Sequence, residues 1–442
     1  MKHLTLTALL LIASLTGAKA QNPIVTDQYS ADPTAKVFDG KLYVYPSHDI
    51  KAIDEMDTTA WFRMEDYHVF MADEKLSNWS DMGVILSDKD VPWVKQGSYS
   101  MWAPDIVKRG DKYYFLFPAQ PDGNRRGFGV GIAENTRPYG RFTPRKEPIK
   151  GVFGIDPCLL QDDDGKMYLF WGGGGLVGAE LDQSMDSVKG RPVFFDRTLP
   201  KGFKEGPFAF KRNGKYYLTF PWVKEKTEKL AYAMSDSPLG PYEFKGVIMD
   251  ETPGCWTNHH SLVEYQNQWY LFYHTNAYSP HFDKNRSVCA DSLFFNADGT
   301  IQKVMPTLRG VGITPAQQHI QIDRYSTASE GIKIDFLNRK DYFQGWKTIF
   351  TAKNAAVTYN RVDFGNGQLR AVRAYVRADK KGVLQLSLNG KAVAKIKVKP
   401  SEAWTEIVAP VKNIPAGICD VTLTSLADTD IELDWISFTA SK

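Results

Sequence analysis

The stretch Asp39-Gly-Lys-Leu-Tyr-Val-Tyr45 joins a two-residue turn to an aromatic-rich segment. Asp-Gly followed by such a segment is a strong β-hairpin signal, because both turn residues tolerate a positive φ. Related turn-plus-aromatic stretches begin at Gly110, Asp164, Asn213 and Asn267. The chain of 442 residues therefore carries five copies of one hairpin phrase.

The spacing of the copies indicates the architecture. Successive copies start 49 to 71 residues apart, and residues 21–310 show little helical periodicity. Roughly fifty residues of β structure per copy are typical of a propeller blade with four short strands. A second phrase recurs late in the second and fourth copies, at Ala133–Phe142 and Ala233–Tyr242. We therefore predict an all-β chain that begins with a five-bladed β-propeller.

The repeat also predicts which side chains meet. In a propeller the innermost strand of each blade runs along the central axis, so equivalent positions on those strands converge. The positions seven or eight residues before the five turns are Asp32, Trp102, Asp156, Glu205 and His259. Three of them are carboxylic acids, which repel one another when clustered. Such a cluster indicates catalysis or metal binding rather than a contribution to stability.

The residues around these positions refine the prediction. Proline directly follows Asp32 and Asp156, and it lies two residues after Glu205. Because proline disfavours helical backbone in the preceding residue, we expect the acids in extended backbone at strand starts rather than on mobile loops. His259 is a weaker candidate, since a lone histidine more often belongs to a core, and the neighbouring His260 is an alternative.

The last quarter of the chain returns to short β segments. A hairpin turn is predicted at Asn389-Gly390, and Ile431–Phe438 alternates as a strand does. About 110 residues of short strands are typical of a β-sandwich. The predicted organisation is a leader (1–20), the propeller (21–310), a connecting segment (311–329) and the sandwich (330–442).

The first twenty residues form a separate unit. Lys2 and His3 precede an apolar run, Leu4–Leu15, which ends in Gly17-Ala-Lys-Ala20. A basic start, a short apolar core and a small-x-small site are typical of a secretory signal peptide. We expect cleavage near Ala20 and export to the periplasm or the medium. The alternative is a membrane anchor, but the run is shorter than the ~20 residues of a spanning helix, so no membrane insertion is expected.

Charge and cysteine content exclude several classes of protein. The 54 basic and 51 acidic residues leave a net charge of +3, which gives no electrostatic reason to expect a nucleic-acid partner. The four cysteines lie far apart with no C-x-x-C pair, so neither a zinc framework nor a disulfide scaffold is predicted. Free buried thiols are expected, with a Cys255–Cys289 bridge as the alternative.

An ordered set of motifs between about Ile24 and Gly310 resembles glycoside hydrolase family 43. The set comprises Ser30-Ala-Asp32-Pro, Trp102-Ala-Pro-Asp105, Ile155-Asp-Pro-Cys158, Asp162-Asp-Asp-Gly165, Glu205-Gly-Pro-Phe208, Asn258-His-His-Ser-Leu-Val263 and Arg286-Ser-Val. No single motif is specific, but the set in this order is. The family contains five-bladed propellers that act on arabinose- and xylose-containing glycans.

The resemblance implies a role for each matched residue. Asp32 matches the general base, Glu205 the general acid, and Asp156 the third carboxylate that orients the acid and tunes its pKa. His259 matches a histidine near a central ion, commonly calcium, which would be structural or electrostatic. The chemistry itself would need no cofactor.

Two further matches concern substrate binding. Trp102 and Arg286 match positions that shape the terminal-sugar subsite. The C-terminal unit resembles a family 6 carbohydrate-binding module through Arg361-Val-Asp-Phe-Gly365, Ala403-Trp-Thr405 and Glu432-Leu-Asp-Trp435. Tyr359 and Trp404 are its candidate sugar platforms. Glu432 stands where such modules carry a sugar-binding Asn, so a sandwich that only buttresses the propeller is the alternative.

The resemblance implies an exo-acting, inverting glycosidase that removes terminal α-L-arabinofuranosyl residues, or β-xylosyl residues, from plant glycans. Inversion requires two carboxyl groups far enough apart to admit a water molecule. A non-catalytic, glycan-binding propeller is disfavoured by the complete acid set. A retaining fructan-type hydrolase is disfavoured because Ala31-Asp-Pro-Thr34 replaces the Asn-Asp-Pro-Asn-Gly-like phrase of that class.

Overall fold

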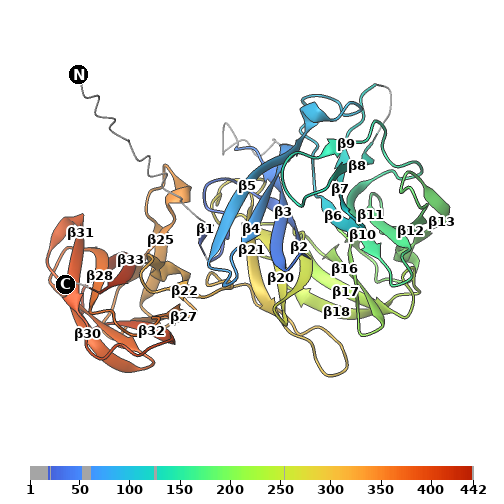
Figure 1. Ribbon diagram of the computed structural model, residues 1–442. Coiled ribbons are helices and arrows are strands. Elements are labelled where there is room, and N and C mark those ends of the chain that lie inside the picture. The colour runs from blue at the N-terminus through green and yellow to red at the C-terminus, as the bar shows by residue number, and fades with distance from the viewer. Residues whose placement is uncertain (1–17, 20, 52–60, 124–126, 253, 441–442) are drawn as a thin grey trace, which may run out of the picture.

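The computed structural model describes residues 18–19, 21–51, 61–123, 127–252 and 254–440 as two β-rich units side by side (Figure 1). The first unit contains all strands from Ala18 to Leu293, and the second contains those from Thr314 to Thr439. The prediction of an all-β chain, a propeller followed by a β-sandwich, is confirmed. The predicted signal peptide lies, apart from two residues, outside the described part of the chain.

The described part of the first unit forms five antiparallel sheets that follow one another along the chain. The first holds β1 (Ala18–Lys19), β2 (Ala31–Phe38), β3 (Lys41–Asp49), β4 (Met64–Ala72) and β5 (Asn78–Ser87). The second holds β6 (Asp105–Arg109), β7 (Lys112–Ala119), β8 (Gly129–Asn135) and β9 (Thr143–Pro144). The third holds β10 (Ile155–Gln161), β11 (Met167–Gly172), β12 (Val177–Leu181) and β13 (Val188–Phe194). The fourth holds β14 (Phe203–Lys204), β15 (Phe208–Arg212), β16 (Lys215–Val223), β17 (Glu228–Ser235) and β18 (Glu243–Met249), and the fifth β19 (Ser261–Tyr265), β20 (Gln268–Thr275) and β21 (Ser287–Leu293).

Each repeated turn occupies the same place in its own sheet. The turn at Asp39-Gly40 joins β2 to β3, and the four later copies join β6 to β7, β10 to β11, β15 to β16 and β19 to β20. Asp39, Asn213 and Asn267 have φ values of 50°, 49° and 62°, which aspartate and asparagine tolerate better than most residues. The turn chemistry therefore sets where each sheet begins.

Apolar side chains close the sheets into a ring. One core cluster joins Val44 and Phe70 of the first sheet to Phe272 and Val288 of the fifth. Further clusters join the first sheet to the second, the second to the third, and the third to the fourth and fifth. The chain start also seals the ring, because Ile24 N–H donates to the Val288 carbonyl at 2.9 Å.

The backbone at the acids differs from the expectation. Asp32 and Asp156 have φ values of 49° and 58°, so they are left-handed rather than extended. Each lies in a β-bulge, where the register of β2 on β3 and of β10 on β11 shifts by one residue. A bulge leaves the extra residue unpaired and re-aims its side chain, and the surrounding sheet holds the unfavourable φ in place. The prediction of extended backbone was therefore wrong at both positions.

The second unit contains two sheets that enclose one apolar core. One sheet holds β22 (Thr314–Pro315), β24 (Thr327–Ala328), β27 (Ala356–Asp363), β29 (Gly382–Leu388), β30 (Lys391–Val398) and β32 (Ile418–Ser425). The other holds β23 (Ile320–Gln321), β25 (Ile332–Phe336), β26 (Trp346–Phe350), β28 (Ala371–Ala378), β31 (Ser401–Pro410) and β33 (Ile431–Thr439). Segment 311–329, expected to be a connection, supplies β22, β23 and β24, because Ala316, Ile320 and Ile322 pack in the sandwich core. The described residues also form four short 3-10 turns, at Asp88–Asp90, Phe195–Arg197, Ile322–Arg324 and Tyr342–Gln344.

A polar and aromatic contact fixes the sandwich to the propeller. Tyr278 of the propeller stacks on Trp346 of the sandwich with 4.9 Å between ring centroids. Arg324 donates to the Asn22 carbonyl at 2.9 Å and to the Tyr278 hydroxyl at 2.8 Å. All three side chains are buried or nearly so, which makes this contact part of the folded structure rather than a loose tether.

Two smaller predictions can be compared with the structure. All four cysteines are free and buried, so the alternative Cys255–Cys289 bridge is not formed. Within the described residues, no helix combines the length and apolar character needed to cross a membrane.

Candidate active site

One cavity of about 270 Å³ brings the five repeat-equivalent positions together. Asp32, Trp102, Asp156, Glu205 and His259 all line it, together with Arg286. The remaining lining includes four aromatic side chains and three polar ones: Trp61, Phe62, Phe203, Trp256, Thr257, Asn258 and His274. Residues that lie in, or directly next to, strands of all five sheets thus converge on one cavity, as the repeat phase predicts.

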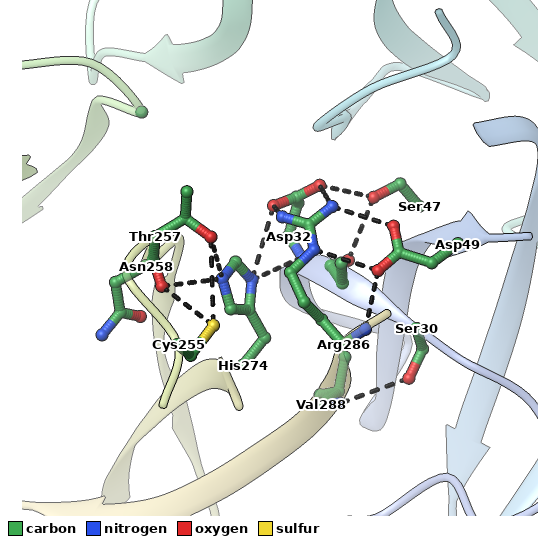
Figure 2. Close-up of polar contacts among 12 residues, drawn as sticks. Ser30, Asp32, Ser47, Asp49, Cys255, Thr257, Asn258, His274, Arg286 and Val288 are labelled. Atoms are coloured by element: carbon green, nitrogen blue, oxygen red, sulfur yellow. Dashed lines mark hydrogen bonds and ion pairs between the residues drawn. The ribbon is translucent and has the colours of Figure 1, made fainter. Parts of the chain in front are cut away.

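Asp32 is held as a buried anion. Arg286 Nη1 donates to its Oδ1 at 2.8 Å, and the Ser47 hydroxyl donates to its Oδ2 at 2.6 Å; Figure 2 shows both contacts. Burial alone would raise the pKa of Asp32, but the Arg286 guanidinium outweighs it and holds that pKa well below the ordinary value. Asp32 is therefore ionised at neutral pH.

Arg286 is itself held between two carboxylates. Its Nε donates to Asp49 Oδ2 at 3.0 Å, its Nη2 donates to Asp49 Oδ1 at 2.9 Å, and its backbone N–H donates to Asp49 Oδ2 at 2.8 Å (Figure 2). The side chains of Asp32, Asp49 and Arg286 are at most 6% exposed. Such a planar fork fixes the guanidinium more firmly than a lysine ammonium could be fixed. The sequence analysis did not identify Asp49, which lies at the end of β3 without a motif of its own.

His274 completes the surroundings of Asp32. The Asp32 backbone N–H donates to His274 Nδ1 at 3.2 Å, so this ring nitrogen is an acceptor. The proton then belongs on Nε2, which lies 3.2 Å from the Thr257 carbonyl. Burial lowers the pKa of His274, which favours this neutral tautomer.

Asp156 contacts the backbone next to Glu205. Its Oδ2 accepts from the Gly206 N–H at 3.0 Å, and Gly206 has a φ of 52°. This hydrogen bond ties the third sheet to the residue that follows Glu205, so it orients the glutamate. Burial raises the pKa of Asp156 well above its ordinary value, and the nearby Glu205 and Asp32 raise it further.

Glu205 shares its site with a second glutamate that the sequence analysis missed. Burial raises the pKa of Glu205; a hydrogen bond from Glu228 lowers it, and the charge of Asp32 raises it. Glu228 is 1% exposed and accepts from the Asn258 N–H at 2.5 Å. Burial and the adjacent Glu205 hold the pKa of Glu228 well above its ordinary value. Glu205 and Glu228 therefore retain a proton at a pH at which Asp32 is ionised.

The two neighbouring histidines have different environments. His259 lines the cavity, whereas His260 is fully buried outside it, and His260 Nε2 lies 2.6 Å from the Thr219 hydroxyl. Burial lowers the pKa of His259 to about 4, so its ring is neutral and available as a ligand. The side-chain amide of the adjacent Asn258 is buried with no hydrogen-bond partner. An unpartnered carbonyl oxygen next to a neutral imidazole suits a cation.

Aromatic rings form one wall of the cavity. The half-buried Trp102 packs on Phe128 at 4.6 Å between ring centroids. Phe62 lies under the Arg286 guanidinium at 4.5 Å, with Trp256 beside it at 6.2 Å. Flat apolar faces of this kind pack on the C–H faces of sugars. Of the four aromatic residues that line the cavity in addition to Trp102, none carries a motif that the sequence analysis could use.

The candidate sugar platforms of the sandwich fare differently. The prediction for Tyr359 was wrong: its ring is fully buried, its hydroxyl accepts from Gln21 at 2.6 Å, and Arg309 lies over its face. Trp404 lies half-buried in strand β31 rather than on a loop, stacked on Tyr375 at 5.3 Å. Sugar binding by Trp404 stays a prediction.

A cavity lined by an anionic carboxylate, Asp32, by a carboxyl group with a raised pKa, Glu205, and by aromatic rings has the groups that cleavage of a glycosidic bond requires. Fold and site together define a propeller-type carbohydrate hydrolase. The profile of Glycosyl hydrolases family 43 matches residues 20–301, and that of Carbohydrate binding module (family 6) matches residues 326–440. The chain belongs to family 43 and is a glycosidase.

Individual relatives agree with this assignment. The chain is 36% identical over 334 residues to xylosidase/arabinosidase 43A of Humicola insolens, covering 64% of this chain and 99% of that protein. It is 27% identical over 464 residues to an arabinoxylan arabinofuranohydrolase of Bacillus subtilis, covering 89% of this chain and 86% of that protein. Among solved structures, a family 43 β-xylosidase/α-arabinofuranosidase from a compost metagenome superposes with a TM-score of 0.58 at 34% identity, covering 65% of this chain and 98% of that one.

Replacing Arg286 by methionine should make the folded protein less stable as the pH rises. A salt-bridged aspartate has the opposite effect, because it makes the folded state more stable as the pH rises. Without the guanidinium, burial raises the pKa of Asp32 above its unfolded value, so the folded state loses stability as pH rises through that value. At neutral pH the loss should reach about 3–5 kcal/mol, the usual cost of leaving a buried charge unpaired. Urea unfolding of both proteins between pH 4 and 8 measures it. Arg286→Lys, which keeps a cation, is the control, and a pH-independent difference would contradict the account.

Proposed function

We propose that this protein is an exported, exo-acting glycosidase that releases terminal α-L-arabinofuranosyl residues from arabinose-containing plant glycans. The observation that carries the proposal is the opposite protonation of Asp32 and Glu205, which line one cavity, with Glu205 paired to the buried Glu228. A cavity of about 270 Å³ suits one terminal sugar rather than a long chain segment. β-Xylosyl residues are the second candidate, because a 35% identical relative from Xylanibacter ruminicola is named a β-xylosidase.

The proposed mechanism uses the two states of the carboxyl groups. Asp32, ionised beside Arg286, is the general base that removes a proton from the attacking water. Glu205, protonated, donates to the leaving oxygen as the glycosidic bond breaks. Asp156 orients Glu205 through its hydrogen bond to Gly206 N–H at 3.0 Å. The oxygen of the water bonds to the anomeric carbon as the glycosidic bond breaks, and the configuration at that carbon inverts.

A calcium ion on the propeller axis is proposed as an electrostatic support. His259 and the unpartnered Asn258 amide oxygen would face it, with water completing the hard oxygen shell that calcium requires. When bound, the ion supplies positive charge near the acid cluster and takes no part in bond breaking. Export is proposed on the basic, apolar and small-residue pattern of residues 1–20.

Replacing the acid tests the central role. Glu205→Gln keeps the shape of the side chain but has no proton to donate, so turnover of an arabinoxylan oligosaccharide should fall at least ~10²-fold. Aryl arabinofuranosides with an acidic phenol leaving group should lose less, because that oxygen departs without protonation. Product release measured by chromatography checks both, with circular dichroism to verify folding. An equal loss of turnover on the two substrates would contradict the role of Glu205 as the acid.

A parallel hydrolysis screen with aryl arabinofuranosides, xylosides and galactosides decides which terminal sugar the enzyme removes.

The stereochemistry of the product tests the water-mediated step. Proton NMR recorded during the first minutes of hydrolysis should show the anomer of inverted configuration. A retained anomer would mean that a carboxylate attacks the sugar directly, and the role of Asp32 as a base would be abandoned.

A hollow beside the cavity supports a polymeric or oligomeric substrate. It has a volume of about 460 Å³ and is lined by Phe128, Phe153 and the segment Glu147–Val152, among others. Phe128 packs on Trp102, so the hollow adjoins the catalytic cavity. Phe153 is 76% exposed and lies three residues before Asp156. We infer that sugars beyond the scissile bond stack on Phe153.

Removing the Phe153 ring should lower activity on long substrates and leave activity on short ones unchanged. Phe153→Ala should lower kcat/KM for arabinoxylan oligosaccharides about fivefold, which corresponds to about 1 kcal/mol of stacking. Aryl arabinofuranosides, which do not reach the hollow, should be unaffected. Phe194→Ala is the matched control, because Phe194 is 56% exposed and lines neither hollow. A loss shared by both substrates would contradict the stacking role.

A further inference from the structure

A second cluster of metal-binding side chains lies on the first sheet, outside the catalytic cavity. One potential ligand atom from each of His48, Asp66 and His68 lies within 4.8 Å of the other two. In the described part of the chain this is the one group of three or more His, Cys, Asp or Glu residues that meets this distance. None of the three lines the catalytic cavity.

The sheet itself brings the three side chains together. Asp66 and His68 are two residues apart on β4, so they share one face, and Ser47 of β3 pairs with Tyr67 between them. His48 comes from the neighbouring strand on that same face, with its ring centroid 5.2 Å from that of His68. A scaffold of two antiparallel strands holds ligands more firmly than a loop does.

Carboxylates orient both imidazoles. His68 Nδ1 lies 2.8 Å from Oδ2 of Asp81 on β5, which is outside the group of three, and His48 Nδ1 lies 2.7 Å from Oδ1 of Asp66, which belongs to it. A carboxylate on one ring nitrogen fixes the tautomer and leaves the other nitrogen free as a ligand, the arrangement that supports metal-bound histidine. The four side chains are 14% to 37% exposed, so an ion can enter from solvent.

We propose that His48, Asp66 and His68 form a binding site for a divalent transition-metal ion of the zinc type, with Asp81 as the positioning residue for His68. Two neutral imidazoles and one carboxylate are a donor set that zinc binds, and water can fill the fourth position. The charges of Asp66 and Asp81 balance the two charges of the ion. Calcium, which prefers six or more oxygen ligands, fits this nitrogen-containing set poorly.

The site stands apart from the catalytic cavity but shares a strand with it. His48 lies between Ser47 and Asp49, whose side chains contact Asp32 and Arg286 on the opposite face of β3. An ion bound to His48 would therefore hold the strand that carries these two residues. Because this proposal rests on the first sheet alone, it does not depend on which sugar the enzyme removes.

Calorimetric titration of the chelator-treated, full-length protein with Zn²⁺ tests the site. The wild type should bind one Zn²⁺ ion. The affinity for this ion should fall more than 100-fold in His48→Ala and in His68→Ala, and 10- to 100-fold in Asp81→Asn. His281→Ala, which removes a histidine elsewhere, is the matched control and should leave binding unchanged. Circular dichroism verifies that each variant folds.

Anomalous diffraction at the zinc absorption edge locates the ion independently. A peak between His48 and His68 supports the site. No binding by the wild type overturns it, and so does an ion that persists in the His48→Ala and His68→Ala variants, because that ion would belong to another site such as His259. With either of these two results, the His48–Asp66 contact would be an ion pair without a metal-binding role.

Discussion

The placement of Arg286 between Asp32 and Asp49 is the interaction on which the catalytic cavity depends. Five carboxyl groups lie in or beside the cavity with one guanidinium among them: those of Asp32, Asp49, Asp156 and Glu228 are buried, and that of Glu205 is half-buried. One cation cannot compensate so many anions, because each buried ion without a partner costs several kcal/mol. Asp32 and Asp49 both contact the guanidinium, which holds the pKa of Asp32 well below its ordinary value, whereas burial and the charge of Asp32 leave the pKa of Asp49 raised. Burial also raises the pKa of Asp156, Glu205 and Glu228. The difference between the proposed base and the proposed acid thus follows from burial opposed, at Asp32, by the guanidinium contact.

The sheet geometry turns that electrostatic difference into a catalytic arrangement. Asp32 and Asp156 each occupy a bulge with a positive φ, and Glu205, the proposed acid, precedes Gly206 in the gap between β14 and β15. A regular strand would point alternate side chains into the walls of the blade, whereas a break can turn one toward the axis. The apolar clusters between neighbouring sheets hold these breaks, so the strain is retained where function needs it.

The sequence could predict the site residues that the repeat or a motif carries. Turn position predicted Asp32, Asp156 and Glu205 because each precedes a turn by seven or eight residues, and a motif match predicted Arg286. Asp49 and Glu228 lie elsewhere in their blades, and an isolated acid in an apolar strand resembles an ordinary surface residue until its burial is known. Tyr359 failed for the converse reason: an aromatic ring in a short β segment can face either solvent or the core, and the sequence pattern does not say which of the two it faces.

Glu228 changes how the acid of this cavity must be understood. Two carboxyl groups that share a hydrogen bond titrate as a pair, so the proton available to the leaving oxygen belongs to Glu205 and Glu228 together. The alkaline limit of activity then reports the first ionisation of this pair rather than a property of Glu205 alone. Glu228 also accepts from the N–H of Asn258, the residue before His259. A cation bound at His259 would stabilise the ionised form of Glu228 and so leave the shared proton on Glu205. An ion bound at His259, as proposed, would therefore be coupled to the proposed acid through one buried carboxyl group.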